Sequence, residues 1–261
     1  EYFNAGMNSS MLKGAQLSGG SRAVELGLIT LKGTKSLANI MFMFGLLTAA
    51  GILYISYLNT GSTSNSYHSA IIALIGVLIG YFYTAKPIKL SSRYGLGEIA
   101  IFLSFGPLLT LGSGFAISME TIQLFSNEFY NLMILGVPIG LLTTNILFIN
   151  QFPDYTSDKK VGKNHLVVLF GKKASRWIYA INLALATGSL YYMAVENIVN
   201  ETQDSLFLYV LIPITIIYSF YLISGLFKYY NNRKLIKYNI HTIYFHMLFS
   251  FIYMIILANF Q

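Results

Sequence analysis

Seven long apolar runs, separated by short polar segments, dominate the hydrophobic pattern of the chain. Each has about the 17 to 25 residues with which an α-helix crosses the hydrocarbon core of a bilayer. The runs cover residues 37–58, 69–85, 97–118, 130–149, 176–195, 206–227 and 241–259. The pattern predicts an all-α fold, a polytopic membrane helical bundle of seven transmembrane helices, and we expect a single domain over residues 1–261.

All 17 Lys and Arg residues fall on one side of the predicted membrane. That side comprises the segments 1–36, 86–96, 150–175 and 228–240, with Arg176 at the border of the third. The segments on the other side, 59–68, 119–129 and 196–205, contain no Lys or Arg. Cytoplasmic segments of membrane proteins are usually the basic ones. We therefore expect the basic side, and any active site on it, to face the cytoplasm at a prokaryotic plasma membrane.

The composition agrees with a membrane protein and narrows the chemistry. Of the 261 residues, 55% are hydrophobic and only 10% are charged, whereas soluble proteins carry about 25% charged residues. The chain has no cysteine, which excludes disulfides, zinc–thiolate sites and a thiol nucleophile. Basic segments that face anionic lipid account for most of the net charge of +7, so we expect no nucleic-acid partner.

A polar stretch with candidate chemistry follows the fourth apolar run. Asn150, Asp154 and Asp158 are spaced four residues apart, so they share one face if the backbone stays helical through Pro153. Two carboxylates aimed at one point need a cation between them, and Mg²⁺ suits hard oxygen ligands and phosphate oxygens. Basic residues that suit a polyanion follow directly: Lys159, Lys160 and Lys163. The stretch predicts a metal-bound diphosphate site, and the simpler alternative is a charged, solvated loop.

A second polar stretch lies at the start of the chain. Asn4 and Asn8 repeat the spacing of four residues, with Glu1 nearby. The likeness predicts an internal repeat whose two motifs face each other across a cavity. In the loop at 18–22, glycines allow backbone N–H groups to approach an oxyanion, and Arg22 can bind a phosphate through two hydrogen bonds. A plain turn is an equally good interpretation of that loop.

The segment between the second and third runs supplies two further candidates. Tyr83 lies near the end of one predicted helix, and Glu98 lies in the first turn of the next, where the helix dipole favours an acid. An interfacial tyrosine and a helix N-terminal acid are the simpler interpretations. Gly106-Pro107 further along either breaks a helix beside a cavity or permits close helix contact, of which close packing is the simpler.

Several of these motifs together resemble one family. The stretch Asn150-x-x-x-Asp154-x-x-x-Asp158-Lys-x-x-Gly162-Lys163 is similar to the second aspartate motif of the UbiA superfamily of intramembrane prenyltransferases. Within that superfamily, the branch that uses 1,4-dihydroxy-2-naphthoate in menaquinone biosynthesis has motifs similar to three further stretches. These are Tyr83-Thr84-x-x-Pro87, Gly95-Leu96-Gly97-Glu98 and Phe105-Gly106-Pro107. The likeness extends along nearly the whole chain.

The resemblance implies a fold, a cofactor and two substrates. The family has nine transmembrane helices, so the seven runs would be its third to ninth, and we expect the chain as given to lack the first two. The implied donor is a polyprenyl diphosphate held by Mg²⁺, and the implied acceptor is an aromatic molecule. The resemblance assigns Asp154, Asp158 and Asn150, with Asn4 and Asn8, to the metal. It assigns Arg22, Lys159 and Lys163 to the diphosphate, and Tyr83 and Glu98 become candidates for the acceptor side.

One departure from the family pattern leaves two functions open. The family's first motif carries aspartates where Asn4 and Asn8 stand. An asparagine offers a carbonyl oxygen but no negative charge, which weakens a Mg²⁺ site. The chain is thus either an active Mg²⁺-dependent prenyltransferase, or a catalytically weakened or inactive membrane-complex subunit or lipid-binding scaffold. A transporter is less favoured, because the span interiors contain almost no charged residues.

Overall fold

The computed structural model describes residues 23–24, 26–61, 63–198 and 206–258. Glu1, Asn4, Asn8 and Arg22, to which the sequence assigns roles, lie outside these residues. The described helices are α2 (Leu31–Thr60), α3 (Thr63–Thr84), α4 (Leu96–Phe105), α5 (Pro107–Ile117), α6 (Asn127–Lys160), α7 (Leu166–Val195), α9 (Ile212–Tyr229) and α10 (Leu235–Ala258). A 3₁₀ turn, η1 (Leu90–Ser92), precedes α4, and a π turn, η2 (Phe207–Leu211), precedes α9.

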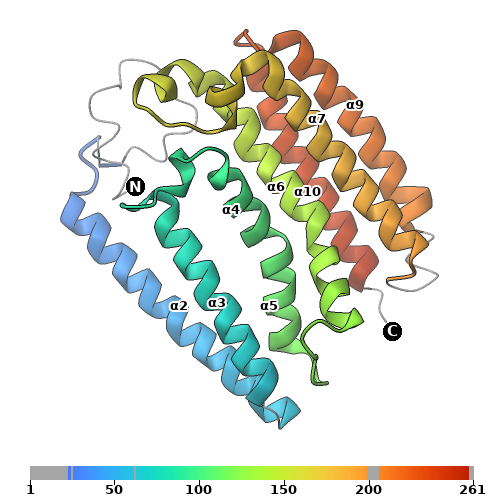
Figure 1. The fold of residues 1–261 in the computed structure, drawn as a ribbon. Helices are drawn as coiled ribbons and strands as arrows, with labels where there is room; N and C mark the ends of the chain where they lie inside the picture. Colours follow the sequence, from blue (N-terminus) through green and yellow to red (C-terminus); the bar gives the residue numbers. More distant parts are fainter. Residues whose placement is uncertain (1–22, 25, 62, 199–205, 259–261) are drawn as a thin grey trace.

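Seven segments of the described chain are long and apolar enough to cross a membrane, with α4 and α5 together forming one of them. This confirms the predicted all-α polytopic bundle. The connections 85–95, 161–165 and 230–234 lie at one end of the bundle, the upper end in Figure 1. The connections α2–α3 and α5–α6 lie at the opposite end (Figure 1). The basic segments between the spans therefore come together at the upper end, as the alternating pattern predicts.

The helices extend beyond the apolar runs at this basic end. α6 reaches Lys160, whereas its apolar run stops at residue 149, and Pro153 lies inside the helix. α7 begins at Leu166, ten residues before its apolar run at 176, and is interrupted at Gly171, whose φ of 75° favours glycine. Hydropathy reports only the part of a helix that lies in lipid. A polar helix end outside the lipid needs no apolar side chains and escapes that pattern.

The main hydrophobic core lies between α6, α7, α9 and α10. Phe148, Tyr179 and Phe249 are fully buried there. The Tyr179 hydroxyl and the Thr242 hydroxyl are 2.7 Å apart, which satisfies both groups between α7 and α10. On the other side of α6, a small cluster of Leu111, Phe115 and Ile122 joins α5 to the α5–α6 connection. α6 is therefore the central helix, and α2 and α3 extend the bundle away from it (Figure 1).

A break between α4 and α5 brings their backbone against α6. Gly106 has φ −120° and ψ −110°, which ends α4 before Pro107 starts α5. A Cβ on Gly106 would lie 2.8 Å from the Gly136 carbonyl oxygen and 2.9 Å from Cα of Gly140. Glycines on both sides thus allow direct backbone contact. The structure confirms the close packing expected for Gly106-Pro107 and shows a helix break at the same place.

Replacing Gly140 with alanine is expected to destabilise the protein by about 1–3 kcal/mol, the usual cost of overpacking a filled interior. The new Cβ would lie 2.6 Å from the Phe102 carbonyl oxygen and 3.0 Å from Cα of Gly106, and neither backbone atom can move aside alone. The measurement is the thermal unfolding midpoint in detergent. Gly188→Ala in α7 is the control, because nothing lies within 4 Å of its added Cβ. Equal midpoints for the two variants would contradict the packing argument.

Candidate functional site

The polar end of α6 carries the two aspartates that the sequence singles out. Asp154 and Asp158 are both 3% exposed, and the helix continues through them to Lys160. The continuous helix therefore places Asn150, Asp154 and Asp158 on one face, one turn apart, as predicted. Buried carboxylates need charged or hydrogen-bonding partners, because desolvation penalises the ionised form. Their surroundings decide what this face can bind.

The connection after α6 folds back onto Asp158. Gly162 has φ 71°, a left-handed conformation that ends the helix, and the Lys163 N–H donates to the Asp158 carbonyl at 3.0 Å. This turn brings the Lys163 Nζ to 3.2 Å from Oδ2 of Asp158. The structure thus joins the predicted metal ligand and the predicted diphosphate contact in an ion pair. The lysine side chain is 25% exposed, so it is only partly covered by the protein.

His165 is a second partner of Asp158, to which the sequence alone assigns no role. Its Nε2 lies 3.1 Å from Oδ2 of Asp158, and the residue is 1% exposed. Its Nδ1 accepts the Val168 N–H at 3.3 Å, so the side chain also caps the start of α7. The glycine turn before it and the helix start after it are the sequence signals that would have placed this histidine near Asp158.

Glu98 connects the starts of α4 and α7 to the end of α6. Its Oε1 accepts the side-chain N–H of Gln151 at 2.9 Å and the backbone N–H of Leu166 at 3.0 Å. The carboxylate is 4% exposed, and these bonds account for its burial. The neighbouring connections also pair, since the Tyr94 N–H donates to the Asn164 carbonyl at 2.7 Å. The expected acceptor-side role of Glu98 stays a prediction beside this observed structural one.

Asn150 has a partner on α10 that sequence reasoning missed. Nδ2 of Asn239 donates to Oδ1 of Asn150 at 2.9 Å. Asn239 is 5% exposed, and its own Oδ1 is buried without a hydrogen-bond partner in the described structure. A buried amide oxygen without a protein partner is a hard donor that suits a cation. The only sequence signal for Asn239 is its position two residues before the last apolar run.

The remaining predicted residues are less closely connected. Tyr83 lies in the last turn of α3 and is partly buried. Lys159 is exposed, and its Nζ lies 5.8 Å from the centroid of the Tyr155 ring, over which Lys172 also lies. A polar cleft of about 270 Å³ adjoins Lys163 and is lined by the connections 89–94 and 161–164. Within the described residues, the strongest cluster is therefore Asp158 with Lys163 and His165.

The donor set fits Mg²⁺ bound together with a phosphate better than a metal held by protein alone. Among the residues that the structure describes, no three His, Cys, Asp or Glu side chains converge as a metal site. The α6 face offers two carboxylates, and Asn150 and Asn239 offer amide oxygens. Mg²⁺ is typically bound through one or two carboxylates, with substrate phosphates and waters completing its shell. These residues could therefore hold Mg²⁺ when a diphosphate supplies further oxygens.

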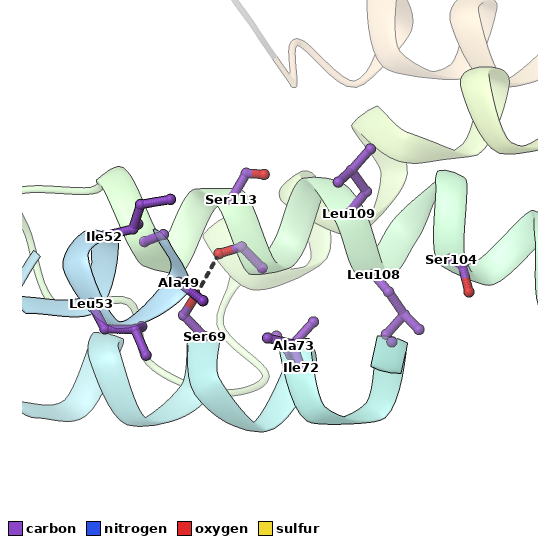
Figure 2. A pocket seen from close by; sticks show the side chains of 13 residues that line it. Ala49, Ile52, Leu53, Ser69, Ile72, Ala73, Ser104, Leu108, Leu109 and Ser113 are labelled. Carbon is purple, nitrogen blue, oxygen red and sulfur yellow. Dashed lines mark hydrogen bonds between the residues drawn. The ribbon is translucent and has the colours of Figure 1, made fainter. Parts of the chain in front are cut away.

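An apolar pocket lies between α2, α3 and the α4–α5 segment (Figure 2). Its volume is about 280 Å³. Figure 2 shows aliphatic side chains from these helices around it, and the Ser69 hydroxyl donates to the Gly112 carbonyl at 3.0 Å. The pocket is lined by Ala49, Ile52, Leu53, Ser69, Ile72, Ala73, Gly76, Ser104, Leu108, Leu109, Gly112, Ser113 and Ala116. None of these residues is charged, so the pocket suits an apolar chain rather than an anion.

Proteins of one enzyme family resemble this chain over most of its length. The family model described as "UbiA prenyltransferase family" matches residues 22–253. A 1,4-dihydroxy-2-naphthoate octaprenyltransferase of Haemophilus influenzae is 26% identical over 182 residues, which are 70% of this chain and 56% of that protein. The protein of the same name in Bacillus subtilis is 31% identical over 123 residues, 47% of this chain and 37% of that protein.

A third relative is named for a different prenyl group. The 2-carboxy-1,4-naphthoquinone phytyltransferase of Synechocystis is 32% identical over 169 residues, which are 63% of this chain and 48% of that protein. The chain spans about half the length of these relatives. No solved structure matches the chain significantly.

Replacing Glu98 with alanine is expected to lower the free energy of unfolding by about 1–3 kcal/mol, because the donors on Gln151 and Leu166 lose their acceptor inside the protein. Glu98→Gln keeps an acceptor oxygen and should lose less. Thermal unfolding midpoints in detergent test the order of the variants. Glu128→Ala, at an exposed position at the other end of α6, is the control and should leave the midpoint nearly unchanged. A midpoint for Glu98→Ala equal to that of the control would refute the anchoring role.

Proposed function

Because this chain belongs to the UbiA prenyltransferase family, we propose that it transfers a polyprenyl group from a polyprenyl diphosphate to an aromatic acceptor in quinone biosynthesis. The observation that carries the proposal is the buried pair Asp154 and Asp158 at the basic end of the bundle, with Lys163 at 3.2 Å from Asp158. The names of two relatives favour 1,4-dihydroxy-2-naphthoate as the acceptor.

In this proposal the α6 face binds the diphosphate end of the donor together with Mg²⁺. Asp154 and Asp158 would hold the cation through carboxylate oxygens, and Asn150 would add an amide oxygen. When bound, Mg²⁺ would neutralise the departing diphosphate. Lys163, already beside Asp158, supplies a second positive charge to the same anion. The buried setting strengthens these interactions because little water is present to screen them.

The reaction that these residues support is electrophilic substitution of an aromatic ring. The bond between the allylic carbon and the diphosphate oxygen breaks, and the electron pair leaves with the diphosphate. A ring carbon of the acceptor then bonds to the allylic carbon. Aromaticity returns when that ring carbon releases a proton, or CO₂ if it bears the carboxylate, and the electron pair of the broken bond returns to the ring. The apolar pocket between α2, α3 and α5 offers space for part of the isoprenoid tail. Tyr83 and Glu98 are proposed to lie toward the acceptor.

The basic end of the bundle sets the proposed location of the reaction. Because Lys and Arg gather in the connections at this end, we assign it to the cytoplasmic face of a plasma membrane. A soluble, anionic acceptor would then reach the site from the cytoplasm, while the donor tail stays in the bilayer. We propose that the single domain over residues 1–261 contains both the site for the acceptor and the space for the donor tail.

Asp154→Ala and Asp158→Ala are each expected to reduce prenyl transfer at least 100-fold, the usual scale for removing one electrostatic contact to a developing charge. Membranes that contain the full-length protein are incubated with Mg²⁺, a labelled polyprenyl diphosphate and 1,4-dihydroxy-2-naphthoate, and the labelled product is measured. Chelating the metal should abolish the product. Glu196→Gln, at an exposed carboxylate on the opposite end, serves as the control.

The outcome also separates the enzyme from a non-catalytic scaffold. Product formed at the control rate by both aspartate variants would refute the assigned site. If the unmodified protein forms no product, binding of the labelled diphosphate is measured with and without Mg²⁺. Binding without product indicates a different aromatic acceptor. Absence of binding indicates that the chain acts as a membrane scaffold, the alternative that Asn4 and Asn8 favour.

A further inference from the structure

We propose that His165 is a positioning residue that holds the Asp158 carboxylate, so that one oxygen stays bound to the protein and the other is presented to the cation. This inference rests on the proposed function and goes beyond it, because His165 belongs to no motif that identifies the site. His165 is the residue directly before α7. It is 1% exposed, and its ring contacts Asp158.

The two oxygens of Asp158 are in different situations. Oδ2 accepts from Nε2 of His165 at 3.1 Å and from Nζ of Lys163 at 3.2 Å. An oxygen with two strong donors has little capacity left for a metal, whereas Oδ1 has neither of these contacts. Asp158 is thereby prepared to bind a cation through a single oxygen. The lysine is free to turn toward an arriving anion, but the buried histidine is not.

The protonation of the imidazole follows from its second contact. The backbone N–H of Val168 donates to Nδ1 at 3.3 Å, so Nδ1 is the acceptor and carries no proton. The tautomer that fits both contacts carries a proton on Nε2, where it donates to Asp158. Both edges of the ring are used, and a single orientation satisfies both. His165 therefore acts as a fixed donor to the Asp158 carboxylate.

The ring is fixed because the backbone around it is fixed. The next residue, Leu166, donates its N–H to Glu98, which also binds Gln151 on α6. Asp158, in contrast, lies in the last turn of α6, where helices tend to fray. The start of α7 is thus the rigid support, and the contact with His165 fixes the position of the Asp158 carboxylate. Without the ring, the amine of Lys163 is the one side-chain donor that would orient Asp158 within the described part of the chain.

Two substitutions separate the helix cap from the contact with Asp158. His165→Thr keeps a side-chain oxygen for the Val168 N–H but is too short to reach Asp158. His165→Gln places an amide N–H near the position of Nε2 and is a poorer cap. Binding of Mg²⁺ in the presence of inorganic diphosphate is measured by calorimetry on the full chain in lipid nanodiscs. Thermal unfolding without Mg²⁺ reports on folding.

We expect His165→Thr to weaken Mg²⁺–diphosphate binding about 10- to 100-fold, the usual effect of losing a residue that orients a metal ligand. Its unfolding midpoint should stay close to that of the unmodified protein, and His165→Gln should recover most of the affinity. His68→Thr in α3 is the matched control, since that histidine packs against Phe115 away from Asp158. It should bind like the unmodified protein.

Each other result has a defined meaning. Unchanged binding in His165→Thr would overturn this inference while leaving the proposed function in place. Loss of affinity in His165→Gln but not in His165→Thr, together with a lowered midpoint for His165→Gln, would show that the histidine only caps α7 and would also overturn it. If the unmodified protein does not bind Mg²⁺ and diphosphate, the proposed function fails, and the role of His165 fails with it.

Discussion

The hydrogen bonds of the buried Glu98 carboxylate determine how the polar end of the bundle is assembled. A carboxylate that is 4% exposed is tolerated only where donors replace water. Gln151 on α6 and the N–H of Leu166 at the start of α7 are those donors. Three helices, α4 and the consecutive α6 and α7, are therefore held at one point. His165 directly precedes Leu166, so its contact with Asp158 depends on the same anchor.

Two different kinds of contact keep α6 in place along its length. In the middle of the bundle, Gly106, Gly136 and Gly140 let backbones touch, with no charged side chain at the contact. At the basic end, charged and amide side chains replace this close packing. The glycine contact positions the helix axis, and the polar contacts orient individual side chains around it. Both kinds of contact matter for the side chains of α6, because a small rotation of the helix would move Asp154 and Asp158 together.

Sequence reasoning predicted the seven spans because length and apolarity suffice to identify a helix in lipid. It also placed Asp154 and Asp158 on one face, since a spacing of four residues needs only a continuous helix. The polar ends of α6 and α7 were not predicted from the sequence, because polar turns outside lipid carry no hydropathy signal. The partners Asn239 and Glu98 are separated from α6 residues by 89 and 53 positions, and no local pattern reports such contacts. Asn4, Asn8 and Arg22 lie outside the described residues, so their roles stay predictions.

Because α2 is attached mainly to one neighbouring helix, the thickness of the bilayer can alter its tilt. Among the described residues, α2 packs mainly on α3, and no residue of its apolar window is buried. With 30 residues it is about 45 Å long at 1.5 Å per residue, more than the roughly 30 Å of hydrocarbon it crosses. A helix that exceeds the membrane thickness responds by tilting. Since α2 forms one wall of the pocket in Figure 2, a thinner or thicker bilayer would change that pocket's width.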